Sequence, residues 1–320
     1  LETKKANKMS EQKKIWLVSR EYDGIAEAGG VKNVTTSLAE NLCRTGIDVT
    51  VIMPLYKCTK FDLLRHYEED VVSPAVVKID GKEVPVRFNS GIANGVKIIL
   101  VNTECFAEKK GVYTYTWEDE KENYVHVKGT GHFDVLYMNT VFQKAVVEYA
   151  KKCIDEEDSQ NKKPDVIHCQ DAACAMVPVF ANIIKKLKQI KYIVTIHNAG
   201  PGYHHEYYSM DIAERLTGLS GFILEKGING RAVEPFLLAG LYAGLIFAVI
   251  SYYSCHTVLE WMGLQGNILE LADVYTRIFS LGIPFISITN CLISVFRAKG
   301  DTKTPLIILP ATGLLNVAMN

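Results

Sequence analysis

The sequence predicts two parts of different fold class, an α/β domain in residues 14–243 and an all-α membrane segment in residues 244–320. Short apolar runs alternate with glycine loops and helical patterns in the first part, as in βαβ units with a parallel sheet. The chain holds 35 basic and 36 acidic residues, but only eight of them lie in residues 236–320. This shortage of charge predicts a different solvent for the second part.

The first βαβ unit is predicted at the start of the α/β domain. Residues 14–18, KIWLV, form a short apolar run that is followed by polar residues, as is typical of a buried parallel strand. A glycine pair follows at positions 29 and 30, and the next apolar run, residues 47–53, is stopped by a proline. Between them, helical spacing predicts a helix with an apolar face formed by Val34, Leu38 and Leu42.

Further elements continue the same alternation. Residues 83–102 predict a hairpin with Ala-Asn-Gly at its turn, and residues 138–153 predict a helix. Residues 162–187 predict a strand, a loop and a helix, and residues 190–200 predict one more strand. Together these elements make the sheet of one α/β domain.

Three of the predicted parallel strands end in polar residues, and ligands of open parallel sheets bind at such carboxyl ends. The glycine pair also lets backbone N–H groups at a helix N-terminus approach an anion. A tight turn explains a glycine pair more often, and a histidine at a strand end can be structural. The residues at the three ends are Ser19 and Glu21, His168 and Asp171, and His197 and Asn198.

Five segments resemble the N-terminal half of the bacterial glycogen/starch synthase family, over residues 14 to about 243. SREYDGIAEAGGVKNV is similar to the family's pattern of a strand followed by E-x-(x)n-K-x-G-G-L-x-D-V. PDVIHCQDA is similar to P-D-V-I-H-x-x-D-W, and TIHNAGPGYHHEYY contains the T-I-H-N motif. GVYTY and EKGINGRAVEPFLLAGLYA resemble the family's Y-G segment and the helix before its inter-domain crossing.

This resemblance implies a GT-B glycosyltransferase fold, in which two Rossmann-like domains face a cleft. It implies retaining transfer of glucose from a nucleotide sugar, usually ADP-glucose, to the non-reducing end of an α-1,4-glucan, with no cofactor or metal. Backbone donors would stabilise charge on the leaving phosphate, and imidazole and carboxylate groups would orient sugar hydroxyls. The implied residues are His197, Asn198 and Asp171 for catalysis, Gly29, Gly30 and Glu27 at the donor, and Tyr113, Glu21 and His168 on the sugar or acceptor side.

Two departures from the family pattern concern these positions. Glu27 stands where the family has a lysine before the glycines, and a carboxylate repels a diphosphate unless it is turned away or protonated. Ala172 stands where the family has a tryptophan after the aspartate. The family's second domain carries most nucleotide contacts and the catalytic acidic motif, and nothing after residue 243 resembles it. The resemblance therefore predicts a synthase that is inactive as written.

The second part contains apolar runs of membrane length. Residues 236–255 are uncharged and would span about 30 Å as a helix, the thickness of a bilayer core. Residues 278–296 form a second uncharged run, and residues 305–320 begin a third. The basic loop 297–303 is expected in the cytoplasm, which places the N-terminal part there too and the runs in the lipid bilayer of the inner or plasma membrane.

Residues 244–320 resemble a fragment of the multidrug and toxic compound extrusion (MATE) transporters, a family of cation-coupled antiporters. The loop RAKGDTKTP at residues 297–305 is the most specific piece. An N-x-x-x-D pair of the family helps to bind the coupling cation, and its positions here are Asn316 and Asn320, so the acidic member is absent. Asn290 and Asn316 are polar residues inside the predicted runs, although hydrogen bonds between packed helices also explain them.

The remaining composition excludes several classes of protein. Eight scattered cysteines show no CxxC pair or metal-ligand spacing, which is typical of reduced thiols. Residues 1–13 are predicted to be a disordered basic N-terminus and not a signal peptide. The net charge of −1 gives no case for nucleic acid.

Three functional hypotheses remain open. The first is a glucan-synthesising glycosyltransferase, which the larger part resembles. The second is a membrane transporter fragment, although three helices alone cannot form an alternating-access pathway. The third is a non-functional fusion or an assembly artefact, joined near Ala243 within a run that is apolar in both families.

Overall fold

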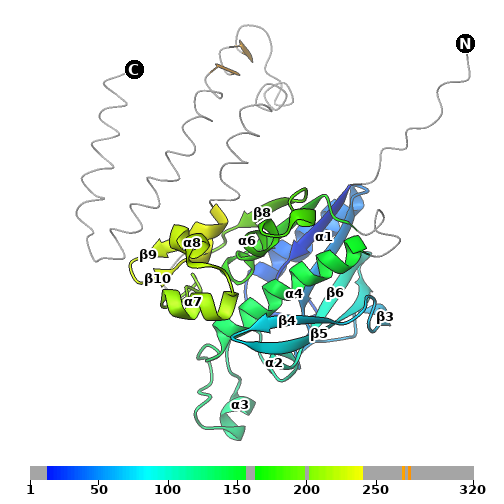
Figure 1. Cartoon of the computed structure of the whole chain (residues 1–320). Helices are drawn as coiled ribbons and strands as arrows, with labels where there is room; N and C mark the ends of the chain where they lie inside the picture. The colour runs from blue at the N-terminus through cyan, green and yellow to red at the C-terminus, as the bar shows by residue number, and fades with distance from the viewer. Residues whose placement is uncertain (1–12, 156–162, 199–201, 241–268, 271–272, 275–320) are drawn as a thin grey trace, which may run out of the picture. The chain divides into compact units, whose positions relative to one another are not determined.

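The computed structural model describes residues 13–155, 163–198, 202–240, 269–270 and 273–274 (Figure 1). Two compact units are distinguished, one reaching to His205 and including Glu214–Gly218, the other made of Glu206–Ala213 and the residues from Leu219 onward. Within the described ranges, no helix is both long and apolar enough to cross a bilayer. The predicted disordered N-terminus and nearly all of the predicted membrane runs lie outside these ranges.

The first unit is built on an eight-stranded mixed sheet with the strand order β3-β5-β6-β2-β1-β7-β8, in which β4 pairs with β5. Neighbours from β6 to β8 run parallel, whereas β3, β4 and β6 pair with β5 in the antiparallel sense. The strands are β1 (Lys14–Val18), β2 (Asp48–Pro54), β3 (Arg65–Glu68), β4 (Ala75–Ile79), β5 (Lys82–Ala93), β6 (Val96–Asn102), β7 (Val166–Gln170) and β8 (Lys191–Thr195).

Helices connect these strands in the α/β manner that the sequence predicts (Figure 1). The helices of this unit are α1 (Val31–Arg44), α2 (Glu104–Ala107), α3 (Trp117–Glu122), α4 (Val135–Asp155) and α6 (Val177–Asn182), with the 3₁₀ turns η1 (Ala172–Cys174) and η2 (Lys185–Leu187). The order β1–α1–β2 confirms the predicted first βαβ unit.

The structure differs from the predicted helices in two respects. The helix expected up to Leu187 ends at Asn182, and a separate 3₁₀ turn follows. In α1, the fully buried side chains are Thr35 and Ala39, whereas Val34 of the predicted apolar face is 45% exposed. Small side chains allow the helix to approach β2 closely, which explains why this face is the buried one.

The predicted hairpin is confirmed in β5 and β6. Ala93 pairs with Val96, so the loop is the two residues Asn94 and Gly95, whose φ angles are 50° and 82°. Positive φ at both positions is the geometry of a type I′ turn, which the Asn-Gly sequence favours.

The core of this unit lies between the sheet and its helices. Leu17, Ile52 and Ile99 belong to the parallel strands and are fully buried, as are Phe142 and Val146 of α4, which packs on β4, β5 and β6 (Figure 1). Burial of each such side chain contributes about 1.5–3 kcal/mol to folding. The sheet is therefore a rigid support for the loops that follow its strands.

The second unit contains a short hairpin and two short helical turns. Its elements are β9 (Ile228–Asn229), β10 (Ala232–Val233), α8 (Gly221–Leu224) and the 3₁₀ turn η3 (Glu225–Gly227). The helix α7 (Met210–Thr217) is divided between the units, and its residues 210–213 belong to the second one. Tyr207 forms an antiparallel bridge with Val233, and both side chains are buried. A Cβ atom on Gly227 would lie 2.5 Å from Leu238 Cγ, so the absence of a side chain there permits the packing of this unit.

Candidate functional site

The three strand ends that carry the predicted polar residues lie side by side in the sheet. β1 pairs with β7 in parallel, with Val18 opposite Cys169, and β7 pairs with β8, with Gln170 opposite Thr195. The segments after β1, β7 and β8 therefore leave the same edge of the sheet. This confirms that the polar ends are neighbours, as the parallel arrangement predicts.

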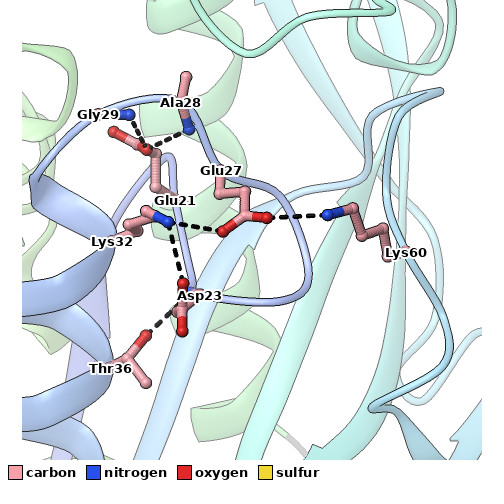
Figure 2. A network of polar contacts seen from close by, with 8 residues as sticks. All are labelled: Glu21, Asp23, Glu27, Ala28, Gly29, Lys32, Thr36 and Lys60. Atoms are coloured by element: carbon pink, nitrogen blue, oxygen red, sulfur yellow. Dashed lines mark hydrogen bonds and ion pairs between the residues drawn. The ribbon is translucent and has the colours of Figure 1, made fainter.

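After β1, the chain forms the loop that leads to the glycine pair and α1. Ser19 Oγ accepts hydrogen bonds from the backbone N–H of Glu21 at 3.1 Å and from the hydroxyl of Thr35 at 3.1 Å. The second of these bonds attaches the loop to α1. The Glu21 carboxylate is fully buried. Its Oε2 accepts the backbone N–H groups of Ala28 at 2.7 Å and Gly29 at 2.6 Å (Figure 2).

An internal carboxylate thus occupies the N–H group of Gly29, which the resemblance assigns to the donor diphosphate, together with that of Ala28. Gly30 differs from Gly29, because a Cβ atom built on Gly30 would meet nothing within 4 Å. Among the described residues, Glu21 Oε1 has no hydrogen-bond partner. The open end of the loop is therefore at Gly30 and the first turn of α1.

Glu27, the departure from the synthase pattern, forms the centre of an ion-pair network (Figure 2). Its Oε2 lies 2.7 Å from Lys32 Nζ and its Oε1 lies 2.8 Å from Lys60 Nζ. Lys32 Nζ also lies 3.1 Å from Asp23 Oδ1. Hydrogen bonds from Lys32 and then Lys60 lower the pKa of Glu27 to about 2, so the carboxylate is ionised and its charge is balanced by lysines.

Tyr113, which the resemblance assigns to the sugar or acceptor side, lies against the glycine loop. A Cβ atom on Gly29 would lie 3.3 Å from Glu21 Oε1 and 3.8 Å from Tyr113 Cε2, which brings three predicted site residues together. Burial, followed by the negative charge of Glu21, raises the pKa of the Tyr113 hydroxyl well above its ordinary value. The phenol is therefore neutral and can donate a hydrogen bond.

Sequence reasoning missed Arg20, whose guanidinium is buried beneath this loop. It donates to Tyr56 Oη at 2.9 Å, to Asn139 Oδ1 at 2.9 Å and to the Val112 carbonyl at 2.6 Å. The guanidinium carbon also lies 5.2 Å from the centroid of the Tyr113 ring. A charged residue between an apolar strand and a polar loop is usually solvated, so the sequence held no signal for this burial.

Asp171 joins the ends of β7 and β8. Its backbone N–H donates to the Thr195 carbonyl at 2.8 Å. Its Oδ1 accepts the backbone N–H groups of His197 at 3.1 Å and Asn198 at 3.4 Å. Asp171 has φ of 63°, a left-handed conformation that costs energy in a residue other than glycine. Three residues predicted for catalysis are thereby brought together.

The two predicted histidines have different partners. His197 Nε2 lies 2.7 Å from Gln170 Oε1, which fixes the ring at the end of β7. His168 Nε2 lies 2.6 Å from Thr195 Oγ1, and burial, then the charge of His197, lowers its pKa below the ordinary value. Gln170 is a second residue that sequence reasoning missed, because one amide at a strand end has no distinctive pattern.

The predicted transporter residues Asn316 and Asn320, as well as Asn290, lie outside the described residues. Ala172, which replaces the family's tryptophan, is buried at the start of η1.

Comparison with known proteins finds two family models that match the chain. The model described as starch synthase catalytic domain matches residues 14–260, and the model described as MatE matches residues 229–320. The two matches overlap in residues 229–260, a range that contains the joint expected near Ala243.

Curated relatives and a solved structure agree with the first match. Glycogen synthases of Thermodesulfovibrio yellowstonii and Exiguobacterium sibiricum are each 26% identical, over 255 and 235 residues, or 74% and 71% of this chain and 47% and 43% of theirs. The catalytic domain of starch synthase IV from Arabidopsis thaliana, solved with ADP and acarbose, has a TM-score of 0.58 at 20% identity and covers 73% of this chain and 44% of that chain. The chain spans about half the length of the curated relatives it matches.

Proposed function

The chain belongs to the family of starch synthase catalytic domains, and from that premise we propose that it is a glycosyltransferase of α-1,4-glucan synthesis. Its donor is a nucleotide sugar, ADP-glucose in the first instance, and its acceptor is the non-reducing end of a glucan. The observation that carries this proposal is the meeting of three strand ends, which collects Glu21, Asp171 and His197 at one edge of the sheet.

The donor diphosphate is assigned to the glycine loop. Glycosyl transfer releases a nucleoside diphosphate, whose growing charge must be stabilised by fixed donors. Gly30 and the first turn of α1 provide an open helix N-terminus, where backbone N–H groups favour an anion. Gly29 shapes the loop, because its own N–H is bound to Glu21.

The transferred sugar is assigned to the ends of β7 and β8. His197 is oriented by Gln170 and can exchange a hydrogen bond with a sugar hydroxyl through its other ring nitrogen. Asp171 keeps one carboxylate oxygen on the N–H groups of His197 and Asn198 and leaves the other for a ligand hydroxyl. His168 is held by Thr195, which suits a supporting role on the acceptor side.

Tight donor binding requires more than the groups of residues 14–240. Two amides of the loop are occupied by Glu21, and the two lysines next to it are paired with Glu27. We expect the chain to bind ADP-glucose weakly, with a dissociation constant on the order of 1 mM. A micromolar constant measured by calorimetry would contradict this expectation.

Transfer is tested by incubating the full chain with ADP-[¹⁴C]glucose and glycogen and measuring radioactivity in the precipitated polymer. The same assay tests the prediction that the synthase is inactive as written, and any incorporation it detects should depend on His197 and be lost in His197→Ala. His66→Ala is the control, because His66 lies on the exposed strand β3. Saturable donor binding without incorporation would restrict the proposal to a binding role, and the absence of both would overturn it.

A second candidate function rests on the MatE match to residues 229–320. Residues 244–320 would then form part of a cation-coupled antiporter in the bilayer, with the N-terminal part on the cytoplasmic side. Extraction of membranes at alkaline pH tests this, because an embedded chain stays in the pellet and a peripheral one is released. Sequencing genomic DNA across codons 230–260 tests the joint itself, since separate genes would lack it.

A further inference from the structure

We propose that residues 115–133, here called the aromatic segment, bind a chain of the glucan acceptor outside the candidate site. The inference rests on the proposed function, because it takes an α-1,4-glucan as the ligand. It gives a binding role to exposed aromatic side chains that take no part in the candidate site.

The aromatic segment is a closed excursion of the chain between α2 and α4, and its helix α3 lies well away from the sheet (Figure 1). The backbone N–H of Tyr115 donates to the Thr130 carbonyl at 3.0 Å, and that of Gly129 donates to the Tyr115 carbonyl at 2.9 Å, so the two ends are joined. Inside the segment, a capping box between Thr116 and Asp119 starts α3. The segment therefore has a defined conformation that holds its side chains in place.

Large apolar side chains of this segment are exposed to solvent. Tyr124 is 86% exposed, Phe133 68% and Trp117 51%, and the neighbouring Val125 and Val127 are each 46% exposed. A single exposed apolar residue is common, but five of them within 17 residues form a patch. Such a patch marks a surface that binds another molecule.

Contacts within the segment restrain two of the exposed rings. Tyr115 is buried at the base, where its ring stacks on His126 with centroids 4.2 Å apart, and the Phe133 ring lies 5.5 Å from it. Lys121 Nζ lies 3.4 Å from the centroid of the Trp117 ring, a cation–π contact that restrains the indole. Rings that are already ordered lose little conformational entropy when a ligand binds.

The charges of the segment decide between the possible ligands. It contains two lysines and four carboxylates, namely Lys121, Lys128, Glu118, Asp119, Glu120 and Glu122. This excess of negative charge disfavours nucleic acid and a bilayer with anionic lipids. The core of a protein–protein interface is depleted of carboxylates, which disfavours a protein partner. A glucan is uncharged, and its glucose units offer apolar C–H faces to aromatic rings and hydroxyl donors to carboxylate oxygens.

The chain connects the aromatic segment directly to the candidate site. Tyr113 lies two residues before Tyr115 and contacts the glycine loop, since its Cε2 lies 3.8 Å from the point where a Cβ atom of Gly29 would stand. A glucan polymer carries many chain ends. A polymer held by the segment therefore raises the effective concentration of these ends near the candidate site, which a short oligosaccharide cannot do as well.

The test is affinity electrophoresis of the full chain, kept in a mild detergent, through native gels that contain increasing amounts of glycogen. Tyr124→Ala and the double variant Trp117→Ala with Tyr124→Ala remove exposed rings, so thermal unfolding should be unchanged in both. We expect glycogen to bind about fivefold more weakly for each ring removed, the usual contribution of one aromatic contact. Phe222→Ala is the matched control, because Phe222 is 74% exposed and also has a lysine, Lys226, 4.7 Å from its ring centroid. It should change the affinity less than about twofold.

Further comparisons separate this surface from the candidate site and from self-association. His197→Ala should keep the affinity for glycogen, and a loss as large as that of the double variant would place the contact at the candidate site and overturn the inference. Equal retardation of the unaltered protein and the double variant would overturn it too. So would a double variant that sediments as a smaller species but binds glycogen normally, because the rings would then contact a second copy of the chain.

The inference and the proposed function fail separately. If no protein is retarded by glycogen, the inference is overturned, whereas the proposed function depends on the transfer of labelled glucose from ADP-[¹⁴C]glucose. If the unaltered protein is retarded and the double variant is not, the inference stands even when no glucose is transferred.

Discussion

The backbone N–H of His197 donates a hydrogen bond of 3.1 Å to Oδ1 of Asp171, which joins the ends of two neighbouring parallel strands. The histidine that faces the proposed sugar is therefore positioned by the aspartate as well as by Gln170. This relationship places the two residues in one rigid arrangement before any ligand arrives, and it leads to the first prediction.

Asp171→Ala should lower the free energy of unfolding by about 1–3 kcal/mol. The variant removes the acceptor for the N–H groups of His197 and Asn198. The alanine keeps the unfavourable φ of 63° but has no side-chain oxygen whose hydrogen bonds offset it. Asp171→Asn is the matched control, because asparagine has nearly the same shape as aspartate and keeps an acceptor oxygen. Urea denaturation measures both, and equal losses in the two variants would contradict the proposed role of Oδ1.

His205 should make the protein less stable in acid. Burial, followed by the charges of Arg20 and His204, lowers the pKa of His205 to about 4. The unfolded chain, with a histidine pKa of about 6.5, binds more protons between these values, so stability falls as the pH drops from about 6.5 to about 4. The slope contributed by one such group is at most about 1.4 kcal/mol per pH unit.

Urea denaturation at several pH values checks this for His205→Asn. Asparagine suits the positive φ of 49° at this position, so the variant isolates the loss of the imidazole. His66→Asn is the control, because His66 has a similar φ of 51° and is exposed. We expect a flatter pH dependence only in His205→Asn, and an unchanged slope there would rule out the assigned titration.

The sequence predicts the elements of residues 13–155 and 163–198 that carry a local signal, but it did not predict β3, β4, α2 or α3. The Asn94–Gly95 turn and the apolar run Lys14–Val18 are examples, since turn chemistry and strand burial follow from adjacent residues. The buried face of α1 could not be read in this way. Val34 continues an apolar pattern, but the helix packs through Thr35 and Ala39 because their size suits the contact.

The candidate site is predictable only in part, for a related reason. Polar residues after parallel strands identify the edge, and the structure brings Glu21, Asp171 and His197 there. The partners that give these groups their properties come from distant segments. Lys60 is 33 residues from Glu27, and nothing in the local pattern links the two. The sequence shows that residue 27 departs from the family, but only the structure shows which lysines balance it.

Gly227→Ala should destabilise the second unit by about 1–3 kcal/mol. The new Cβ atom would lie 2.5 Å from Leu238 Cγ and 3.2 Å from the Glu234 carbonyl oxygen, so the backbone and Leu238 must shift. Adding Leu238→Ala should remove part of this penalty, because the closest clash disappears. Gly240→Ala is the control, since its Cβ atom would meet nothing within 4 Å. Thermal unfolding measures all three, and equal effects at Gly227 and Gly240 would show that packing is not the cause.

Arg20→Lys should destabilise the protein by about 2 kcal/mol or more and weaken ADP binding. The guanidinium donates in three directions at once, to Tyr56, Asn139 and Val112, and a lysine ammonium at the same position cannot reach all three. At least one buried acceptor is then left without a donor beneath the glycine loop, which loosens the support of Glu21 and Gly29.

Arg44→Lys is the control for this variant, because the Arg44 side chain is 70% exposed and its contact with Glu40 at 3.3 Å is of the surface type. Urea denaturation and ADP titration are measured on both proteins. Both variants keep the positive charge. A loss of stability and of ADP affinity that is confined to Arg20→Lys therefore assigns the effect to the directed hydrogen bonds of the buried guanidinium. Equal and small changes in the two variants would mean that the buried positive charge alone, and not its three directed hydrogen bonds, supports the loop.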